Sequence, residues 1–341
     1  MLRPKAAWLT VNRICNFRCQ WCYGQSTGFK YEDTMPYQLA VELTNIAINA
    51  GVQNINIIGG EPTLWPFLDQ YITYCRKVGV KTGLVTNACR FSDDDFWKKY
   101  SNNPCDYMGI SIKSANKESF IKATGVPFFE KTLLGIKRGL SLPESGVSTV
   151  FNNVIGLNEL IETAKLCKKL GAEGFTISMC SAVLNDSDVT DLWSIKLAQL
   201  SHDIMDFYPT IDSLFNGRVT LELYLPLCLF PHDFIDMLVN KKQILSICQL
   251  HERSGIVFDT NGDILPCNTM VKHSIASIKK DFSTGSDLLK YMNCEDMVAQ
   301  YRELLKYPSL ECSKCRYNSI CRGGCIVNWM IFDPSICHHV S

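Results

Sequence analysis

Three cysteines near the N-terminus limit most strongly how this chain can fold. Cys15, Cys19 and Cys22 form a C-x3-C-x2-C triplet. Thiolates at this spacing can hold three irons of a [4Fe–4S] cluster and leave the fourth iron open to a chelating ligand. The triplet follows a strand-like run at residues 7–11. We therefore expect it on a loop at the carboxyl end of a strand, where α/β barrels carry their chemistry.

A second group of seven cysteines lies in the C-terminal third of the chain. Four of them follow the pattern C-x2-C-x5-C-x3-C, and the group comprises Cys248, Cys267, Cys312, Cys315, Cys321, Cys325 and Cys337. Disulfides are disfavoured because the first residues lack the apolar core of a signal peptide and the total of 17 cysteines is odd. Zinc would fit the four spaced cysteines alone, but it would not explain the N-terminal triplet.

Strand-like and helix-like segments alternate over the first two thirds of the chain. Strands are predicted at residues 6–11, 54–58, 81–86, 107–112, 147–155 and 174–179, and helices at, for example, 35–50, 66–78 and 158–170. Such alternation predicts a parallel sheet with right-handed crossovers. Six units of this kind make a partial barrel, and we expect a linker helix near residues 190–208 to close it.

The last third of the chain differs in kind. Residues 255–265 read as two short strands joined at Asn261-Gly262, a dipeptide typical of β-hairpins. The hairpin would bring Cys267 beside Cys248, and the remaining segment is rich in loops and needs metal to order it. We place a domain boundary near residue 210, so that residues 1–209 form the barrel and residues 210–341 form a small cysteine-rich domain.

The composition excludes several classes of protein. The chain has 341 residues, 46% of them hydrophobic, and its formal net charge is zero, which argues against electrostatic binding of nucleic acid. No apolar run approaches the roughly 18 residues of a membrane span. Many thiols without a signal sequence indicate a reducing cytoplasm. We expect a cytoplasmic monomer.

The N-terminal triplet resembles that of the radical S-adenosylmethionine (SAM) enzymes, and the C-terminal cysteines resemble the SPASM extension of that superfamily. The resemblance covers nearly the whole chain. It implies an α/β fold, a partial (β/α)6 TIM-like barrel followed by a small SPASM domain that contains a β-hairpin. It also implies three [4Fe–4S] clusters, SAM as cofactor and a low-potential electron donor of the flavodoxin or ferredoxin type.

The resemblance assigns SAM-binding roles to several residues that, without it, could have purely structural roles. The turn Gly59-Gly60-Glu61-Pro62 resembles the motif that binds the methionyl amine, although alone it is only a strand-to-helix turn. Trp21 would contact the adenine, or simply pack. Further candidates lie at strand ends, namely Ser111, Lys113 and Asn153. Many relatives carry an acidic residue at the position of Lys113.

The family pattern divides the C-terminal cysteines between two auxiliary clusters. Three of them would ligate the nearer cluster, namely Cys248, Cys267 and Cys325. The other four would ligate the distal cluster, namely Cys312, Cys315, Cys321 and Cys337. The nearer cluster lacks an obvious fourth ligand, for which Cys228 is our candidate, the alternative being that this cysteine is a buried apolar thiol.

The resemblance implies that the chain makes a radical that removes hydrogen from an unactivated carbon. We expect a maturase of a ribosomally made peptide that forms a cross-link, a thioether or an inverted stereocentre. For inversion, the candidate hydrogen donor is Cys180 at the end of the sixth predicted strand. The alternative is that Cys180 is a small apolar residue that only packs in the core. Because the predicted barrel begins almost at Met1, we expect no preceding leader-binding module. Either a separate protein presents the substrate or the barrel and extension recognise it.

Three other functions remain open. A sulfatase maturase that forms formylglycine carries an acidic residue after the cysteine equivalent to Cys267, whereas this chain has Asn268. An enzyme that oxidises or rearranges a small molecule is the second. An electron carrier is the third, but a carrier would not need the turn at residues 59–62.

Overall fold

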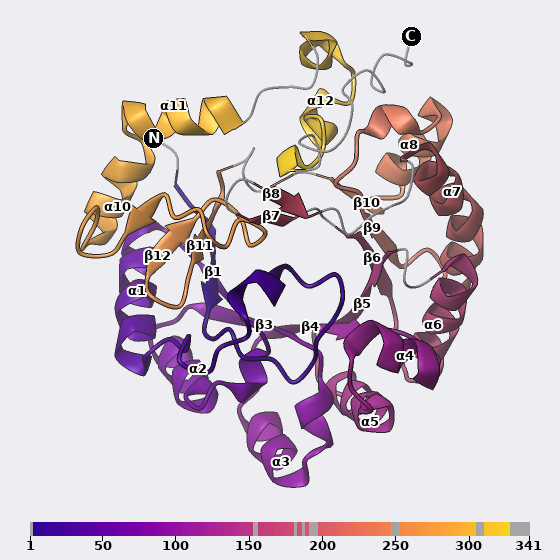
Figure 1. Cartoon of the computed structure of the whole chain (residues 1–341), viewed down its shortest axis with the longest axis horizontal. Helices are drawn as coiled ribbons and strands as arrows, with labels where there is room; N and C mark the ends of the chain where they lie inside the picture. Colours follow the sequence, from indigo (N-terminus) through magenta and orange to yellow (C-terminus); the bar gives the residue numbers. More distant parts are fainter. Residues whose placement is uncertain are drawn as a thin grey trace.

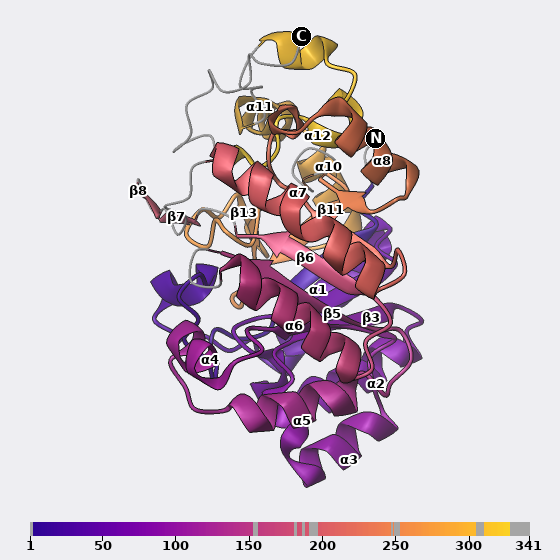
Figure 2. The same cartoon turned by 90° about the vertical axis from the view of Figure 1, so that its right-hand side faces the viewer.

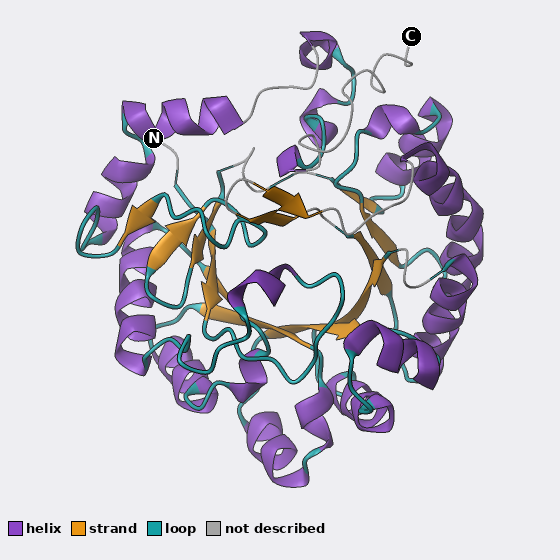
Figure 3. Cartoon of the chain, viewed as in Figure 1, coloured by secondary structure: helices purple, strands orange, loops and turns teal. Residues whose placement is uncertain are grey.

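The computed structural model describes residues 3–152, 156–180, 183–185, 188–190, 197–246, 248, 253–304 and 310–327. Two predicted site residues, Asn153 and Cys337, lie outside these ranges. Within them the chain forms an α/β barrel-like sheet with helices around its outside, as the sequence predicts (Figures 1 and 3). No helix of the described part is long and apolar enough to cross a bilayer.

Six parallel strands follow one another both along the chain and in the sheet. They are β1 (Ala6–Thr10), β2 (Asn54–Ile58), β3 (Lys81–Thr86), β4 (Tyr107–Ile112), β5 (Ser145–Phe151) and β6 (Phe175–Met179). The bounds of β2, β3 and β4 match the predicted ones. Runs rich in Val, Ile and Thr between turn residues are strong strand signals, which explains this agreement.

The connecting helices cover the outer face of the sheet (Figure 3). They are α1 (Tyr37–Ala50), α2 (Leu68–Lys77), α3 (Asp94–Asn102), α4 (Lys117–Thr124), α5 (Phe129–Gly139), α6 (Leu157–Lys169) and α7 (Leu197–Leu214), with short 3-10 turns η1 (Tyr23–Thr27), η2 (Pro62–Leu64) and η3 (Cys89–Ser92). The predicted linker helix at residues 190–208 corresponds to α7, which begins seven residues later. A small hairpin, β7 (Val183–Asn185) and β8 (Asp188–Thr190), precedes it.

The parallel sheet continues beyond the six predicted strands. After α7 the chain adds β9 (Val219–Glu222) parallel to β6, and then β10 (Ile244–Leu245) parallel to β9. The segment between them holds η4 (Leu227–Leu229) and α8 (His232–Asn240). An open edge of a parallel sheet leaves unpaired backbone groups, and β9 satisfies those of β6.

The predicted C-terminal hairpin is present and joins the opposite edge of the same sheet. β11 (Gly255–Phe258) lies parallel to β1 and antiparallel to β12 (Asp263–Leu265), which pairs with β13 (Ala276–Ser277). Gly262 has φ +87° at the turn, and its amide donates to the Asp259 carbonyl at 2.9 Å. The hairpin strands therefore extend the barrel sheet and do not form a sheet of their own.

The remaining helices are short and gather on the side of the barrel opposite α3 and α5 (Figures 1 and 2). They are α10 (Gly285–Met292), α11 (Glu295–Leu304), η5 (Leu310–Lys314) and α12 (Asn318–Cys321). A capping box of Thr284 and Asp287 begins α10. This region carries Cys312, Cys315 and Cys321 of the second cysteine group.

Burial alternates along the strands and shows which face of the sheet is packed. On β4, Met108, Ile110 and Ile112 are buried beneath the helices, whereas Tyr107 and Ser111 on the alternate face are partly exposed. The same alternation holds on β5, β6 and β9. Because successive side chains of a strand point to opposite faces, the inner face of the curved sheet is the accessible one.

The packing of α5 against η3 predicts a specific glycine requirement. A Cβ on Gly135 would lie 1.9 Å from the Ala88 carbonyl oxygen. Gly135→Ala should therefore destabilise the protein by about 1–3 kcal/mol in urea denaturation, although alanine itself favours helix. Gly146→Ala is the matched control, because nothing lies within 4 Å of a Cβ there. A Gly135→Ala protein as stable as wild type would contradict this packing.

Candidate active site at the carboxyl ends of the barrel strands

The cysteine triplet lies on the loop that follows β1, as predicted. The backbone of this loop supplies hydrogen-bond donors to two of its sulfurs. The Phe17 amide donates to Cys15 Sγ at 3.3 Å, and the Gly24 amide donates to Cys22 Sγ at 3.3 Å. Amide donors of this kind stabilise negative charge on sulfur, which suits thiolate ligands of a metal cluster.

Burial raises the pKa of each thiol of the triplet, and that of Cys19 rises to about 11. The positive charge of Lys113 opposes this shift at Cys19 and Cys22. Buried thiols therefore need a cation to become thiolates, and an iron cluster supplies one. The described residues include no group of three ligating side chains gathered around one point. Ligands to separate irons of a cluster stand farther apart than the four thiolates of a single zinc ion.

The Gly59–Pro62 turn follows β2 and lies against the triplet loop. The Gly60 amide donates to the Asn12 carbonyl at 2.9 Å, and the Glu61 amide donates to the Ile14 carbonyl at 2.7 Å. A Cβ on Gly60 would lie 2.2 Å from the Ile14 carbonyl oxygen. Only glycine permits this close approach, so the predicted turn and the predicted triplet form one unit.

The Glu61 carboxylate is buried and held by four donors. Oε1 accepts bonds from the Thr63 amide at 3.1 Å, the Thr63 hydroxyl at 2.7 Å and the Thr86 hydroxyl at 2.6 Å. Oε2 accepts one bond, from the Asn87 amide at 2.8 Å. Thr86 and Asn87, which follow one another at the end of β3, were not among the predicted site residues. A polar pair at that strand end is the signal that would have identified them.

The other predicted SAM-binding residues surround the triplet. Trp21 is buried, and Lys113 is buried at the end of β4, where its ammonium donates to the Ser111 hydroxyl. The charge of Lys113 acts on Cys19 and Cys22, so this cation lies close to the triplet. The structure thus brings these three residues to the triplet, while their roles toward SAM remain predictions.

The three cysteines that the family pattern assigns to the nearer cluster lie around one tyrosine. Burial raises the pKa of Tyr224, and Cys248, Cys267 and Cys325 each contribute to the same shift. The Cys325 amide also donates to the Tyr224 carbonyl at 2.9 Å. Cysteines from three separate segments therefore lie within electrostatic range of Tyr224, two residues after β9.

Cys228 lies beside the cysteines assigned to the distal cluster. Burial raises the pKa of Cys321 to about 11, and Cys228 and Cys315 contribute to that shift. The Leu227 amide donates to Cys321 Sγ at 3.3 Å. Cys228, our candidate fourth ligand of the nearer cluster, thus lies within electrostatic range of Cys321, which the family pattern assigns to the distal cluster. Sequence spacing could not show this neighbour, because the two residues lie on η4 and α12.

A buried ion pair connects the triplet loop to the C-terminal hairpin. Arg13, 5% exposed, pairs with Asp259, 15% exposed, in the hairpin turn. Tyr23 lies close by, since Cys22, Arg13, Cys267 and Asp259 all act on its pKa, which burial raises. Tyr23 thus lies within electrostatic range of one cysteine from each group, Cys22 and Cys267.

Cys180 lies directly after β6, as predicted, and is buried. Its amide donates to the Phe151 carbonyl at 3.3 Å, which continues the pairing of β6 with β5. Because side chains alternate between the two faces along β6, Cys180 lies on the same face as Thr176 and Ser178, which is the inner face. The candidate donor is therefore on the face that its proposed role requires.

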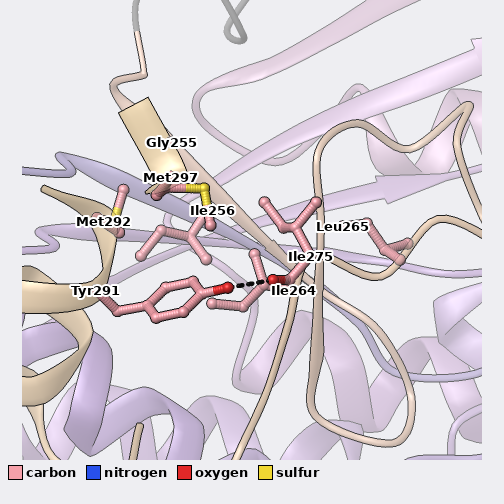
Figure 4. Close-up of a pocket in the computed structure, with 8 residues that line it drawn as sticks. All are labelled: Gly255, Ile256, Ile264, Leu265, Ile275, Tyr291, Met292 and Met297. Carbon is pink, nitrogen blue, oxygen red and sulfur yellow. Dashed lines mark hydrogen bonds between the residues drawn. The ribbon is translucent and has the colours of Figure 1, made fainter. Parts of the chain in front are cut away.

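A small apolar pocket lies apart from this site, between the hairpin and the helices α10 and α11 (Figure 4). Its lining residues are Gly255, Ile256, Ile264, Leu265, Ile275, Tyr291, Met292 and Met297. The Tyr291 hydroxyl, the one polar side-chain group of this lining, donates to the Ile275 carbonyl. The pocket is a packing feature of the hairpin rather than a reaction site.

A parallel barrel with a cysteine triplet at the carboxyl end of its first strand defines a cluster-dependent barrel enzyme. The family model described as the radical SAM superfamily matches residues 9–188, more than half of the chain. The chain therefore belongs to the radical SAM superfamily. Membership implies a [4Fe–4S] cluster and SAM as cofactor.

Two curated relatives match parts of the chain. GTP 3',8-cyclase of Helicobacter pylori is 30% identical over 166 residues, 46% of this chain and 51% of that protein. An S-adenosylmethionine-dependent nucleotide dehydratase of a Thermoplasmatales archaeon is 32% identical over 118 residues, 35% of this chain and 41% of that protein. The chain thus spans about half, or less, of the length of these relatives.

Two solved structures share the fold over nearly the whole chain. SuiB of Streptococcus suis bound to the precursor peptide SuiA superposes with a TM-score of 0.73 at 18% identity, covering 99% of this chain and 76% of SuiB. The anSMEcpe structure with bound AdoMet gives a TM-score of 0.70 at 18% identity, covering 94% of this chain and 89% of that one. These likenesses show that the C-terminal third belongs to the shared fold.

Removing one partner of the Arg13–Asp259 pair should be costly. Arg13→Gln leaves the mostly buried Asp259 carboxylate without its cation, and we expect a loss of about 3 kcal/mol in urea denaturation. The double variant Arg13→Met with Asp259→Leu should lose less, because no charge stays buried. Arg218→Gln is the control, since Arg218 and its partner Glu173 are 65% and 83% exposed. Equal losses in the single and double variants would show that the charge is not the cause.

Proposed function

We propose that this radical SAM enzyme is a SPASM-type maturase that acts on a ribosomally made peptide. The observation that carries the proposal is the placement of the second group of cysteines. Cys248, Cys267 and Cys325 all act electrostatically on Tyr224, two residues after β9 of the barrel sheet. The likeness of the whole chain to SuiB, solved with a precursor peptide, supports a peptide substrate.

Each part of the site has a proposed task. Cys15, Cys19 and Cys22 would hold the cluster that binds SAM, with Glu61 receiving the methionyl ammonium through Oε2 and Trp21 contacting the adenine. Ser111 and Lys113 would receive the ribose or the carboxylate, and the charge of Lys113 would favour the latter. With these groups in place, a reduced cluster and SAM would supply a 5′-deoxyadenosyl radical that removes hydrogen from a substrate carbon.

Two auxiliary [4Fe–4S] clusters complete the proposal, giving three in all. We keep the boundary near residue 210 as a functional division, although the sheet runs across it. Cys228 stays our candidate for the fourth ligand of the nearer cluster, because the four cysteines assigned to the distal cluster already complete its set of ligands. We also propose an external flavodoxin or ferredoxin as electron donor, because SAM cleavage consumes an electron at low potential.

A nucleotide substrate is the second candidate function. It is favoured by the partial similarity to GTP 3',8-cyclase of Helicobacter pylori. The two readings separate in one assay with reconstituted protein, SAM and dithionite. Peptides from short reading frames beside the gene should change mass in step with 5′-deoxyadenosine release. Conversion of GTP, with all such peptides unchanged, would overturn the peptide proposal.

If the triplet holds the SAM-binding cluster, its replacement should remove part of the iron and all of the activity. Wild type should hold about 12 irons in three [4Fe–4S] clusters, and replacement of Cys15, Cys19 and Cys22 by Ala should leave about 8. The same change should abolish 5′-deoxyadenosine formation, because the open iron is lost. The measurements are iron analysis and chromatography after anaerobic reconstitution. Continued 5′-deoxyadenosine formation by the triple variant would disprove the assignment.

The proposed donor role of Cys180 predicts an isotope signature. If its thiol returns hydrogen to the substrate radical and inverts a stereocentre, product made in D₂O should carry one deuterium on carbon, because thiol protons exchange with solvent. Cys180→Ala should still release 5′-deoxyadenosine without inverted product. A two-dalton loss from the product would instead indicate cross-linking or oxidation.

A further inference from the structure

The inner face of the sheet carries a row of hydroxyl groups across four neighbouring strands. Sheet register places Ser111 of β4 beside Ser148 of β5, Ser148 beside Thr176 of β6, and Thr176 beside Thr220 of β9. All four are partly exposed, whereas their neighbours along each strand are mostly buried beneath the helices. We call these residues the hydroxyl row. It places accessible hydroxyl groups on the inner face of four neighbouring strands of the eleven-stranded sheet.

A carboxylate stands at one end of this polar face. Glu222 lies two residues after Thr220, so it points to the same face, and it pairs in register with Ser178 of β6. The Ser178 hydroxyl donates to Glu222 Oε2. Glu222 is partly exposed, and its charge acts on Tyr224, around which Cys248, Cys267 and Cys325 gather. It therefore lies between the hydroxyl row and the cysteines of the nearer set.

Glu222 has no basic partner within the described part of the chain. The ion pairs of that part involve other carboxylates, and the cation at the opposite end of the polar face, Lys113, donates to Ser111. The hydrogen bond from Ser178 engages Oε2, so Oε1 is left as an acceptor on a side chain that the strand alternation assigns to the inner face. A partly desolvated carboxylate of this kind binds an ammonium or guanidinium group through charge-assisted hydrogen bonds.

We propose that Glu222 binds a cationic side chain, Lys or Arg, of the substrate. This contact determines which part of the substrate lies at the inner face of the sheet. The identification of the side chain as Lys or Arg rests on the proposed peptide substrate. The binding of a cation as such rests only on Glu222, Ser178 and the hydroxyl row. Glu222 acts here as a specificity-determining residue, which neither the SAM site nor the cluster ligands provide.

The test uses peptides that differ only in one charge. The probes are N-acetylated, C-amidated heptapeptides with Lys, Arg, Glu or norleucine at the centre and mixed Ala, Ser, Leu and Asn at the flanks. Reconstituted protein with SAM is mixed with them, and retained peptides are quantified by ultrafiltration and mass spectrometry. Wild type should retain Lys- and Arg-centred peptides about tenfold more than norleucine-centred ones.

Variants at position 222 separate recognition from folding. Glu222→Gln keeps the shape and should abolish the preference, and Glu222→Lys should reverse it toward Glu-centred peptides, which a purely structural role would not do. Glu173→Gln, on the outer surface, should keep the wild-type preference. Iron content and far-ultraviolet circular dichroism establish that the variants fold. A cation preference that survives Glu222→Gln, or no preference in wild type, would overturn the proposal.

Agmatine, a small molecule with an amine and a guanidinium, separates this inference from the proposed function. If wild type retains no peptide but binds agmatine in a manner abolished by Glu222→Gln, the cation site stands and the peptide substrate is wrong. If peptides are retained without regard to charge, the peptide substrate stands and the role of Glu222 is wrong. If neither peptide nor agmatine is retained, both are wrong.

Discussion

The hydrogen bonds to the Glu61 carboxylate are the interaction on which the site depends. A parallel sheet brings the carboxyl ends of its strands to one edge, but it does not fix the loops there relative to one another. Glu61 does so, because its amide donates to the loop after β1 while its carboxylate accepts from Thr86 and Asn87 at the end of β3. Three strand ends are thereby held together around the triplet. A carboxylate this deeply buried is tolerated only because four donors surround it.

The Arg13–Asp259 pair extends that unit to the C-terminal third. It joins residues 246 positions apart and ties the triplet loop to the hairpin that carries Cys267. The parallel pairing of β11 with β1 fixes the same relationship through the backbone. Cys267, two residues after β12, is therefore tied to the barrel sheet through this hairpin. In this arrangement a change in the hairpin acts directly on the loop that holds the triplet.

The helices, strands and turns that depend on neighbouring residues could be predicted from local sequence patterns. The strands β2, β3 and β4, the helix that begins at Tyr37 and the hairpin at residues 255–265 follow from periodicity and turn residues. The pairing of β9 with β6 and of β11 with β1 was not predicted, because such pairing depends on tertiary edges. For the same reason the contacts of Thr86 and Asn87 with Glu61 were not predicted. The motif cysteines and the glycine turn were found because their chemistry requires short, fixed spacings.

Electron paramagnetic resonance of the reduced protein, with and without SAM, tests the central claim most directly. The claim is that the triplet loop and Glu61 form one SAM-binding unit. In wild type, SAM should change the signal of one cluster, and Glu61→Gln should abolish that change while iron content stays the same. A wild-type spectrum that does not respond to SAM, or an undiminished response in Glu61→Gln, would contradict the account.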